Sequence, residues 1–495
     1  MSLSILMVGS EAQPFSKTGG LADVLGALPL ALARLGHRVT LVTPKYRGVQ
    51  THGTVSTLQV PLGGGPPGTG IIEQPLADGV RVVFIDRPDL YDRESIYGAG
   101  GSDYSDNARR FGFLARAAME YALVRSAAGD PFDVVHAHDW QAGLCPVYLR
   151  TRYQGTAIGS MASMFTIHNL AYQGSFPPQW LRALDLGPEL LGMSGLEFWG
   201  QVSFLKGGIN FSDVITTVSP TYAAEIQTKE YGAGFEGVLA ARAGDLFGVL
   251  NGVDTDRWDP SKDPFLPEPY DEHTIEKKLA SKSELLEVLG PHAPFLESVE
   301  RPLVGIVSRL VAQKGFDLIA ELADSLPSLH MSFAVLGTGD DEYQKMWLNL
   351  ERKFPDKFGV KIGFDERVAH LIEAAADIFL MPSRFEPCGL NQMYSMRYGT
   401  VPVVRATGGL EDTVTDYNEK TGTGTGFKFT DYTAEALLAA LDRARTVYAN
   451  PSLWKKLQRA GMRQDFSWDR SAREYVKLYE RAVDKPFRRT LAGGP

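Results

Sequence analysis

Short apolar runs of strand length alternate with longer segments of helical character, and this alternation occurs in both halves of the chain. In the first half, the runs at 4–9 and 38–44 predict buried parallel strands, with a helix from about Asp23 to Leu35 between them. In the second half, strands are expected at 303–308, 331–337, 360–363 and 377–383. A further helix is expected from about Gly315 to Leu326. Repeated βαβ units of this kind predict an α/β protein with two Rossmann-like, doubly wound domains.

The length of 495 residues also requires more than one domain, because a single hydrophobic core rarely grows beyond about 250–300 residues. A stretch rich in Asp, Pro and Glu at about 252–300 marks the point where the second domain is expected to begin, with a hinge near Gly252. We predict a first domain over 1–250, a second over 251–470, and a terminal amphipathic helix within 471–495.

The charge balance and the cysteine count exclude several classes of protein. The chain has 50 basic and 59 acidic residues and no long basic run, so we expect no binding to nucleic acid or to a membrane. Its two cysteines, Cys145 and Cys388, cannot build a disulfide framework and indicate a reducing compartment. The N-terminus, MSLSILMVGS, has no basic region ahead of an apolar stretch, and we expect a cytoplasmic protein.

The segment at 383–414, SRFEPCGLNQMYSMRYGTVPVVRATGGLEDTV, carries the densest chemistry. Glu386 follows a predicted strand and can accept hydrogen bonds from a polyol, while a helix expected near Leu390 offers unpaired amides to an anion. After the next strand, Gly408 and Gly409 allow the backbone to approach a ligand closely. The segment therefore suits a sugar nucleotide. The alternative is a pair of ordinary βα loops in which Glu386 is a solvated cap.

Three cations also follow predicted strands. Lys17 precedes Gly19 and Gly20 after the first strand, although the order of residues is not that of a Walker A motif. Arg309 and Lys314 follow the strand at 303–308, where a doubly wound domain binds its ligand. Preorganised cations stabilise a departing diphosphate, but spacing alone leaves open that all three are solvated surface residues.

Polar residues also follow predicted strands at 136–143 and 165–174. His168 and Asn169 can bind sugar hydroxyls, although a lone histidine is more often structural. Asp139 is a candidate ligand residue, and Trp140 is either a sugar platform or part of the core. His136 and His138 lack a convincing third ligand, so we expect no metal site and no cofactor.

Together these runs resemble the bacterial glycogen synthases and plant starch synthases, which are retaining glucosyltransferases of the GT-B type. The resemblance rests on KTGGLADV at 17–24, HAHDWQAG, FTIHNLAYQG, NGVD at 251–254, SRLVAQKG at 308–315 and the 383–414 segment. It implies two Rossmann-like domains facing each other across a deep cleft that closes over the donor, and a final helix, 471–485, that crosses back to the first domain. It further implies catalytic roles for Glu386, His168, Arg309 and Lys314. The implied substrate-binding residues are Lys17, Gly19, Gly20, Asp23, Asp139, Asn169, Asn251, Phe364, Cys388, Gly389, Thr407, Gly408 and Gly409.

The resemblance implies transfer of glucose from ADP-glucose to the nonreducing 4-hydroxyl of an α-1,4-glucan, with retention and without a metal. The family resembles the E-x7-E glycosyltransferases, which carry a second glutamate eight positions after the first, but here that position is Tyr394, a departure that bacterial glycogen synthases tolerate. A two-carboxylate mechanism is therefore disfavoured, and a front-face transfer remains. Phe364 stands where relatives often have a tyrosine that stacks on the base, and it does not exclude UDP-glucose. A catalytically inert glucan- or nucleotide-binding protein, and another GT-B transferase such as a sucrose or trehalose-phosphate synthase, remain alternatives. The sequence leaves the oligomeric state open.

Overall fold

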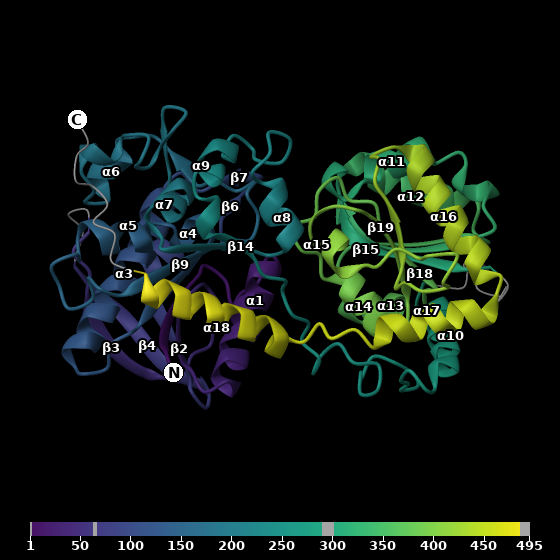
Figure 1. The fold of residues 1–495 in the computed structure, drawn as a ribbon, viewed down its shortest axis with the longest axis horizontal. Helices are drawn as coiled ribbons and strands as arrows, with labels where there is room; N and C mark the ends of the chain where they lie inside the picture. Colours follow the sequence, from purple (N-terminus) through teal and green to yellow (C-terminus); the bar gives the residue numbers. More distant parts are fainter. Residues whose placement is uncertain (1, 63–66, 290–300, 486–495) are drawn as a thin grey trace. The chain divides into compact units, whose positions relative to one another are not determined.

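The protein is described by a computed structural model that covers residues 2–62, 67–289 and 301–485. The chain forms two compact units (Figure 1). The first takes in the described residues of Met1–Val218, Ala223–Gly252 and Trp468–Pro495, and the second those of Ser219–Tyr222 and Val253–Ser467. The chain therefore changes units at 252/253 and 467/468, where we predicted 250/251 and 470/471. The short excursion at Ser219–Tyr222 was not expected.

The first unit is built on a nine-stranded sheet in the order β14-β13-β9-β8-β1-β2-β5-β4-β3. All its pairings are parallel except those of β3 with β4 and β4 with β5. The strands are β1 (Ser4–Val8), β2 (Arg38–Pro44), β3 (Thr54–Gln59), β4 (Gly68–Ala77), β5 (Val80–Asp86), β8 (Val134–His138), β9 (Ala162–Ile167), β13 (Val214–Thr217) and β14 (Leu246–Gly248). The strand order reverses between β1 and β8, because β1 pairs with β2 on one side and with β8 on the other. This reversal is where a doubly wound sheet binds its ligand.

Helices of the first unit pack their apolar residues on this sheet. They include α1 (Gly20–Arg34), α3 (Asn107–Ala127), α4 (Asp139–Ala142), α5 (Leu144–Thr151), α7 (Phe204–Phe211), α9 (Glu236–Ala240) and α18 (Trp468–Asp484). A small antiparallel sheet of β10 (Ser175–Phe176), β11 (Glu197–Phe198) and β12 (Gln201–Ser203) lies between the main strands in sequence. The core has a large apolar cluster, in which Leu25 on α1 and Ile5 on β1 are fully buried.

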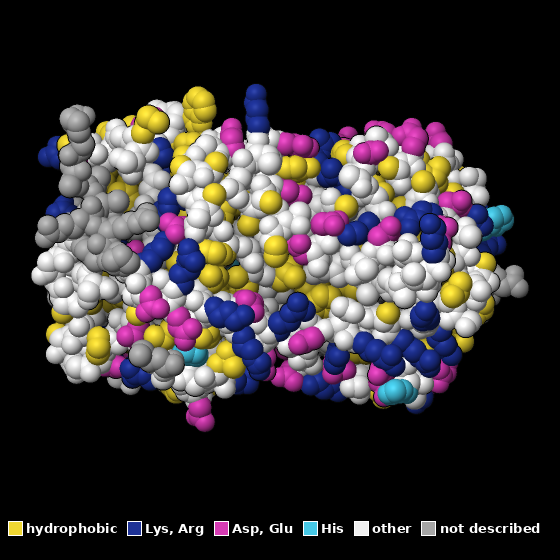
Figure 2. All heavy atoms as spheres, viewed as in Figure 1, with side chains coloured by type: hydrophobic (Ala, Val, Ile, Leu, Met, Phe, Trp, Pro, Cys, Tyr) yellow, Lys and Arg dark blue, Asp and Glu magenta, His cyan; other side chains and the backbone are white. Residues whose placement is uncertain are grey.

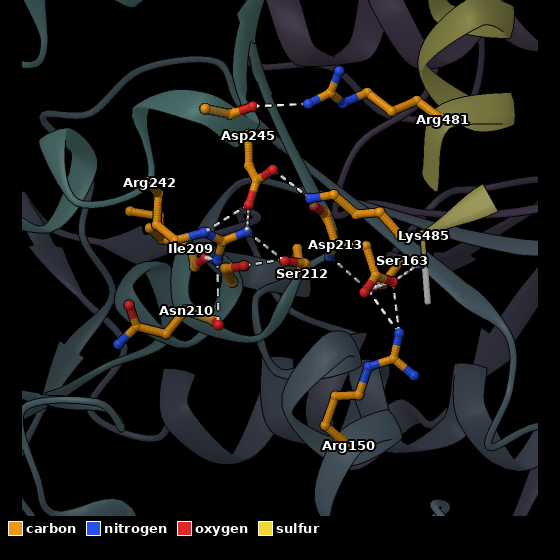
Figure 3. Close-up of polar contacts among 12 residues, drawn as sticks. Arg150, Ser163, Ile209, Asn210, Ser212, Asp213, Arg242, Asp245, Arg481 and Lys485 are labelled. Atoms are coloured by element: carbon orange, nitrogen blue, oxygen red, sulfur yellow. Dashed lines mark hydrogen bonds and ion pairs between the residues drawn. The ribbon is translucent and has the colours of Figure 1, made fainter. Parts of the chain in front are cut away.

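The C-terminal helix α18 belongs to the first unit, beside α1 (Figure 1). Its Tyr475 and Tyr479 are fully buried in the same cluster as Leu25. Beyond its end, Lys485 donates to the carbonyl of Asp213 (2.5 Å) and forms an ion pair with Asp245 (Figure 3). The buried Arg150 holds the Asp213 carboxylate at 2.6 Å from the other side (Figure 3). Apolar burial and this charged network together fix the helix on the unit.

The second unit has a six-stranded, fully parallel sheet in the order β17-β16-β15-β18-β19-β20. Its strands are β15 (Leu303–Leu310), β16 (Ser332–Gly339), β17 (Phe358–Ile362), β18 (Ile378–Met381), β19 (Val401–Arg405) and β20 (Phe427–Phe429). In chain order this is the 3-2-1-4-5-6 arrangement of a dinucleotide-binding fold, which reverses between β15 and β18. The helices are α10 (Lys278–Leu289), α11 (Phe316–Glu321), α12 (Asp341–Lys353), α13 (Glu366–Ala375), α14 (Asn391–Arg397), α15 (Gly408–Thr413), α16 (Ala434–Tyr448) and α17 (Pro451–Met462).

The predicted strands and fold class are confirmed, with shifts at helix ends. β2 has the predicted bounds, and α14 begins beside the predicted Leu390. Helix α1 begins at Gly20 rather than Asp23, because Gly19 in an extended conformation is its N-cap. The helix predicted over 315–326 was too long: α11 ends at Glu321, and a separate 3₁₀ turn covers Leu326–Ser328. The glycine-rich run at 63–69 lies partly outside the described residues, and β4 already begins at Gly68.

The helices and the surface side chains can be compared with the expectation that the protein binds neither a membrane nor nucleic acid. In the described parts of the chain, every helix is too short or too polar to cross a membrane. On the face drawn in Figure 2, both acidic and basic side chains are present, and basic ones gather over the part of the second unit that carries α17. Hydrophobic side chains on that face are scattered among polar atoms, as on ordinary protein surfaces.

Candidate active site

The predicted site residues of the second unit gather at the carboxyl ends of its parallel strands. Arg309 and Lys314 lie at the end of β15, Glu386 follows β18, and Gly408 follows β19. β15 and β18 are the strands between which the sheet order reverses. In open α/β sheets of this kind, ligands bind outside the carboxyl ends of the strands at the point where the strand order reverses. The sequence thus predicted the right edge of the sheet.

Lys314 and Glu386 form the centre of this group. The Lys314 ammonium lies 2.5 Å from Glu386 Oε2, and the Ser383 hydroxyl donates to the same oxygen at 3.0 Å. Glu386 is 5% exposed, so its charge is held by these two donors rather than by bulk water. Gly315, next to Lys314, has a φ of 81° and leaves no room for a side chain against the Pro382 carbonyl. The backbone of both loops therefore fixes the ion pair.

Arg309 lies on the same side of the sheet in a more exposed position. Its guanidinium donates to Gln313 Oε1 at 3.0 Å, and Gln313 Nε2 reaches the carbonyl of Phe385 at 3.4 Å. Two cations and one carboxylate are thereby linked through neighbouring loops. Sequence reasoning missed the linking residues Gln313 and Ser383, because a glutamine and a serine in a loop carry no pattern that distinguishes them.

Gly408 and Gly409 serve the protein's own backbone. A Cβ on Gly408 would lie 2.0 Å from the Glu386 carbonyl oxygen, and one on Gly409 would lie 2.0 Å from that of Cys388. The Gly409 amide also donates to the Glu386 carbonyl at 3.1 Å. These glycines thus let the 386–389 loop pack on the start of α15, where we had expected close approach of a ligand. Thr407 is the N-cap residue of α15.

Two further side chains donate hydrogen bonds to the backbone carbonyls of the loop at 386–389. Gln392 Nε2 donates to the carbonyls of Cys388 (3.1 Å) and Gly389 (3.0 Å), and Gly389 has a φ of 70°. Cys388 is a buried thiol outside any disulfide. Ser219, in the excursion that belongs to this unit, donates to the Pro387 carbonyl at 2.6 Å. Both Cys388 and Gly389 therefore contribute backbone geometry to the position of Glu386.

Two aromatic residues of the second unit have opposite environments. Phe364 follows β17, and its side chain is 89% exposed. Tyr394, eight positions after Glu386, stacks on Trp258 at 4.0 Å with an angle of 5° between the rings. Trp258 stacks in turn on His370. Tyr394 is therefore a packing residue here, whereas Phe364 presents a whole ring to solvent.

In the first unit, the predicted residues near the N-terminus form a loop organised by a residue that sequence reasoning missed. Glu11 is 3% exposed and accepts hydrogen bonds from the amides of Thr18 and Gly19 and from the Thr18 hydroxyl. The Tyr97 hydroxyl also donates to Glu11. Lys17 is exposed and pairs with Asp23 at 2.6 Å. Asp23 lies in the first turn of α1, so it is not the N-cap.

Replacing Glu11 by glutamine should loosen this loop. A glutamine offers one acceptor oxygen and turns an amide group towards other donors, so at least one amide loses its partner. We expect hydrogen exchange of the peptide containing Thr18 and Gly19 to accelerate roughly tenfold, for a loss of about 1–2 kcal/mol of local stability. Exchange measured by mass spectrometry would show this.

The matched control is Glu120→Gln. Glu120 also accepts from a tyrosine hydroxyl, that of Tyr153, in the same unit. Its replacement should leave exchange at Thr18 and Gly19 unchanged. If both variants accelerate exchange there equally, Glu11 has no specific hold on the loop.

His168 and Asp139 are brought together at the ends of β9 and β8. The amide of His168 donates to Asp139 Oδ1 at 2.7 Å, and Asp139 has a φ of 55°. Burial raises the pKa of Asp139 to about 7, against the opposing effect of the amides of His168 and Asn169. Asn169 closes a turn by accepting from the amide of Ala171. Asp139 is thus a residue that positions the loop of His168 and Asn169.

Three imidazoles, those of His168, His138 and His136, lie next to one another in this part of the first unit. His168 Nε2 is 2.9 Å from His138 Nδ1, and the ring of His138 lies 4.0 Å from that of His136. Both nitrogens of His136 are in hydrogen bonds, with Tyr479 at 2.8 Å and with Thr166 at 2.6 Å. Desolvation lowers the pKa of His168 to about 3 and those of His136 and His138 well below their usual range. His168 is therefore a neutral hydrogen-bonding group, and the nitrogens of His136 are already engaged.

The two remaining candidates of the first unit differ in character. Trp140 is 7% exposed and packs against Phe111, Phe176 and Phe204, so it belongs to the core. Asn251 follows β14 and is 7% exposed, and its Oδ1 is buried without a hydrogen-bond partner among the described residues. A buried acceptor of this kind costs free energy unless something donates to it.

Comparison with known proteins agrees with this architecture. Residues 4–241 match the family described as the starch synthase catalytic domain, and residues 292–461 match the glycosyl transferases group 1. The chain is 46% identical to a glycogen synthase of Koribacter versatilis over 97% of its own length and 98% of that protein. It is 45% identical to one of Syntrophotalea carbinolica, over 97% and 99%.

Solved structures point the same way. The catalytic domain of starch synthase IV from Arabidopsis thaliana, bound to ADP and acarbose, matches with a TM-score of 0.88 and 34% identity over 98% of this chain and 100% of that one. A sucrose-phosphate synthase from Thermosynechococcus elongatus shares only the fold, at 18% identity and a TM-score of 0.57. Near-complete coverage at this identity leads to one conclusion: the chain belongs to the glycogen synthase family of glycosyltransferases, with the GT-B fold.

Proposed function

We propose that the protein transfers glucose from ADP-glucose to the nonreducing 4-hydroxyl of an α-1,4-glucan, with retention at the anomeric carbon and release of ADP. The observation that carries the proposal is the buried pair of Lys314 and Glu386, with Arg309 beside it, where the second sheet reverses its strand order. The starch synthase IV structure, whose ligands are ADP and acarbose, supports both substrate classes.

In the proposed reaction, the bond from the anomeric carbon to the β-phosphate oxygen breaks while a bond to the acceptor oxygen forms on the same face. The leaving phosphate oxygen takes the proton of the acceptor hydroxyl. Negative charge grows on the diphosphate as the bond breaks, and Arg309 and Lys314 stabilise it from fixed positions. Glu386 accepts hydrogen bonds from the hydroxyls of the glucose. His168, a neutral imidazole of the first unit, is assigned to the binding of sugar hydroxyls.

The residues of the first unit complete this assignment. We assign Lys17, Gly19, Gly20 and Asp23 to substrate binding through the loop that Glu11 holds, and Asn169 and Asn251 to contacts with sugar hydroxyls. Asp139 acts through the His168 loop, whose amides it binds. We place the reaction in the cytoplasm, which suits a chain whose two cysteines are both thiols.

Phe364 is proposed to stack on the adenine. Its ring is 89% exposed, and stacking on a base is worth about 1–3 kcal/mol. Phe364→Ala should therefore raise KM for ADP-glucose by roughly 5- to 160-fold, with kcat changed little. Steady-state kinetics would measure this, and Phe364→Tyr, which keeps the ring, should retain the original KM. An unchanged KM in Phe364→Ala would remove the stacking role.

The test of the proposed function is release of ADP from ADP-glucose by the purified protein in the presence of glycogen. UDP-glucose serves as the competing donor, and omission of glycogen as the control. Glycogen-dependent ADP release supports both donor and acceptor. Turnover of UDP-glucose alone would overturn the donor assignment, and absence of turnover with both would favour an inert binding protein.

A further inference from the structure

The tip of the hairpin formed by β11 and β12 has an aromatic residue where the backbone disfavours one. Phe198 pairs with Gln201, so Trp199 and Gly200 form a two-residue turn. Their φ angles are 52° and 76°, as a type I′ turn requires. Asn-Gly is the preferred pair in such turns, and a bulky residue at positive φ is uncommon. The fold therefore accepts backbone strain at Trp199.

The strained residue contributes little to the core. Trp199 is 82% exposed, while its neighbour Phe198 faces inward and stacks on Phe235 at 4.0 Å. Backbone strain that does not improve packing is concentrated at functional sites, where a side chain must be held in one place. An exposed indole combines a broad apolar face with an N–H donor, which suits a ligand that is both apolar and hydroxylated.

A side-chain hydrogen bond and a neighbouring glycine hold the tip of the hairpin. The Gly200 amide donates to Glu197 Oε1 at 2.9 Å, which closes the turn. Next to it, Gly234 has a φ of 88°, and a Cβ there would lie 3.2 Å from Trp199 Nε1. A side chain at position 234 would therefore crowd the indole. The Trp199 ring thus lies beside Gly234, with most of its surface in contact with solvent.

The hairpin is also continuous with the loop of His168 and Asn169. That loop runs on through Tyr172, which is 57% exposed, to β10, and β10 pairs with β12 of the hairpin. Gln173 Nε2 donates to the carbonyl of Ala233, the neighbour of Gly234. Tyr172 and Trp199 are thus exposed aromatic residues on segments that strand pairing joins to the loop proposed to bind sugar.

We infer that the tip of the β11–β12 hairpin is a glucan-binding platform, on which the indole of Trp199 stacks against a glucose ring of the acceptor away from the reacting end. The inference rests on the proposed function for the identity of the ligand. An α-1,4-glucan is a long chain, and each of its rings has an apolar face between hydroxyl edges, which matches an exposed tryptophan. Contacts away from the reacting end raise affinity for long acceptors without altering the chemical step.

Trp199→Asn removes the indole ring and keeps a residue that suits the turn, so it tests the ring without disturbing the fold. Asn-Gly is the preferred type I′ pair, so this variant should melt at the same or a higher temperature than the wild type. In native gels containing glycogen and no sugar nucleotide, we expect its dissociation constant for glycogen to rise roughly tenfold, as for the loss of one good aromatic contact. Trp199→Phe, which keeps an aromatic face, should bind nearly as the wild type does.

The control is Met193→Ala, which removes an apolar side chain that is 89% exposed in the same unit, outside the hairpin. It should bind glycogen as the wild type does. In the transfer assay, Trp199→Asn should raise KM for glycogen and leave KM for ADP-glucose, kcat and the KM for a short malto-oligosaccharide unchanged.

The outcomes separate this inference from the proposed function. Equal glycogen binding by Trp199→Asn and wild type overturns the inference, and so does a Trp199→Phe variant as weak as Trp199→Asn. A wild type that transfers glucose but is not retarded by glycogen overturns the inference and leaves the function intact. Retardation that depends on Trp199 without any ADP release supports the platform and overturns the function.

Discussion

Glu386→Gln should lower kcat by about 10²- to 10³-fold while leaving the fold intact. The glutamine has nearly the size of the glutamate, so the loop around it is expected to persist. It carries no charge, however, and it has one acceptor oxygen instead of two. That oxygen would have to accept from Lys314 and Ser383 and also from the sugar hydroxyls, so the hydrogen bonds to the sugar become weaker. Single-turnover kinetics with ADP-glucose and glycogen would measure the loss, alongside the melting temperature.

Glu284→Gln is the matched control for this variant. Glu284 also forms an ion pair with a basic residue of the second unit, Arg367, but on α10, outside the strand ends. Its replacement should change kcat by less than twofold, since a part-exposed ion pair contributes about 0–1 kcal/mol. A Glu386→Gln variant that keeps a tenth or more of the wild-type kcat would exclude a catalytic role for Glu386.

The 2.5 Å contact between Lys314 and Glu386 predicts that the two residues act as a unit. Lys314→Ala removes a charge from the diphosphate site and also leaves the buried carboxylate without its cation. The kcat of the double variant should therefore lie within a few-fold of the kcat of the slower single variant. The reason is that the effects of two interacting residues on the rate do not multiply. Multiplicative losses would show that Lys314 and Glu386 act separately.

The sequence predicted the sheet edges well because strand ends are marked locally. An apolar run followed by a charged or glycine-containing turn places Glu386, Arg309 and His168 at the carboxyl edge of a parallel sheet, whatever the rest of the chain does. Parallel sheets confine their ligand sites to that edge. The three residues are found there in the structure, as is the reversal of strand order beside Glu386 and Arg309.

What the sequence did not indicate are contacts between segments far apart in the chain. Glu11 holds the loop of Thr18 together with Tyr97, whose hydroxyl comes from 86 residues away. Gly408 was expected to make room for a ligand, but it makes room for the carbonyl of Glu386. A glycine's need for space can be seen in sequence, whereas the group that fills the space is decided by tertiary packing.

The stability of the first unit should fall steeply as the pH drops from about 6.5 towards 4.5. His136 and His138 are fully buried, and desolvation lowers the pKa of each well below its usual value of about 6.5. Between the folded and unfolded pKa values, the unfolded chain binds more protons than the folded one. Stability therefore rises with pH in this window and is lost as the pH falls through it.

The expected slope follows from the number of protons. Each imidazole that stays neutral in the fold and is protonated in the unfolded chain contributes about 1.4 kcal/mol per pH unit, so His136, His138 and His168 together contribute about 4.1. Asp139, whose pKa is raised to about 7, holds a proton in the fold that the unfolded chain loses, and it opposes them by about 1.4, which leaves a net slope of about 2.7. The rings of His136 and His138 lie 4.0 Å apart, and a charge on one further disfavours a charge on the other. Pulse proteolysis across a urea series at several pH values, with peptides of the first unit identified by mass spectrometry, would measure the slope.

His136→Gln assigns the slope to the imidazoles. A glutamine amide has a donor and an acceptor for Tyr479 and Thr166, the two partners of His136, and it does not ionise in this range. The slope should then decrease by about 1.4 kcal/mol per pH unit, whereas His52→Gln, at an exposed histidine, should keep the wild-type slope. An unchanged slope in His136→Gln would mean that other groups govern acid unfolding. A smaller slope would show that the imidazoles behind the His168 loop are kept neutral by burial, which is the state in which His168 can serve as a hydrogen-bonding group for a sugar.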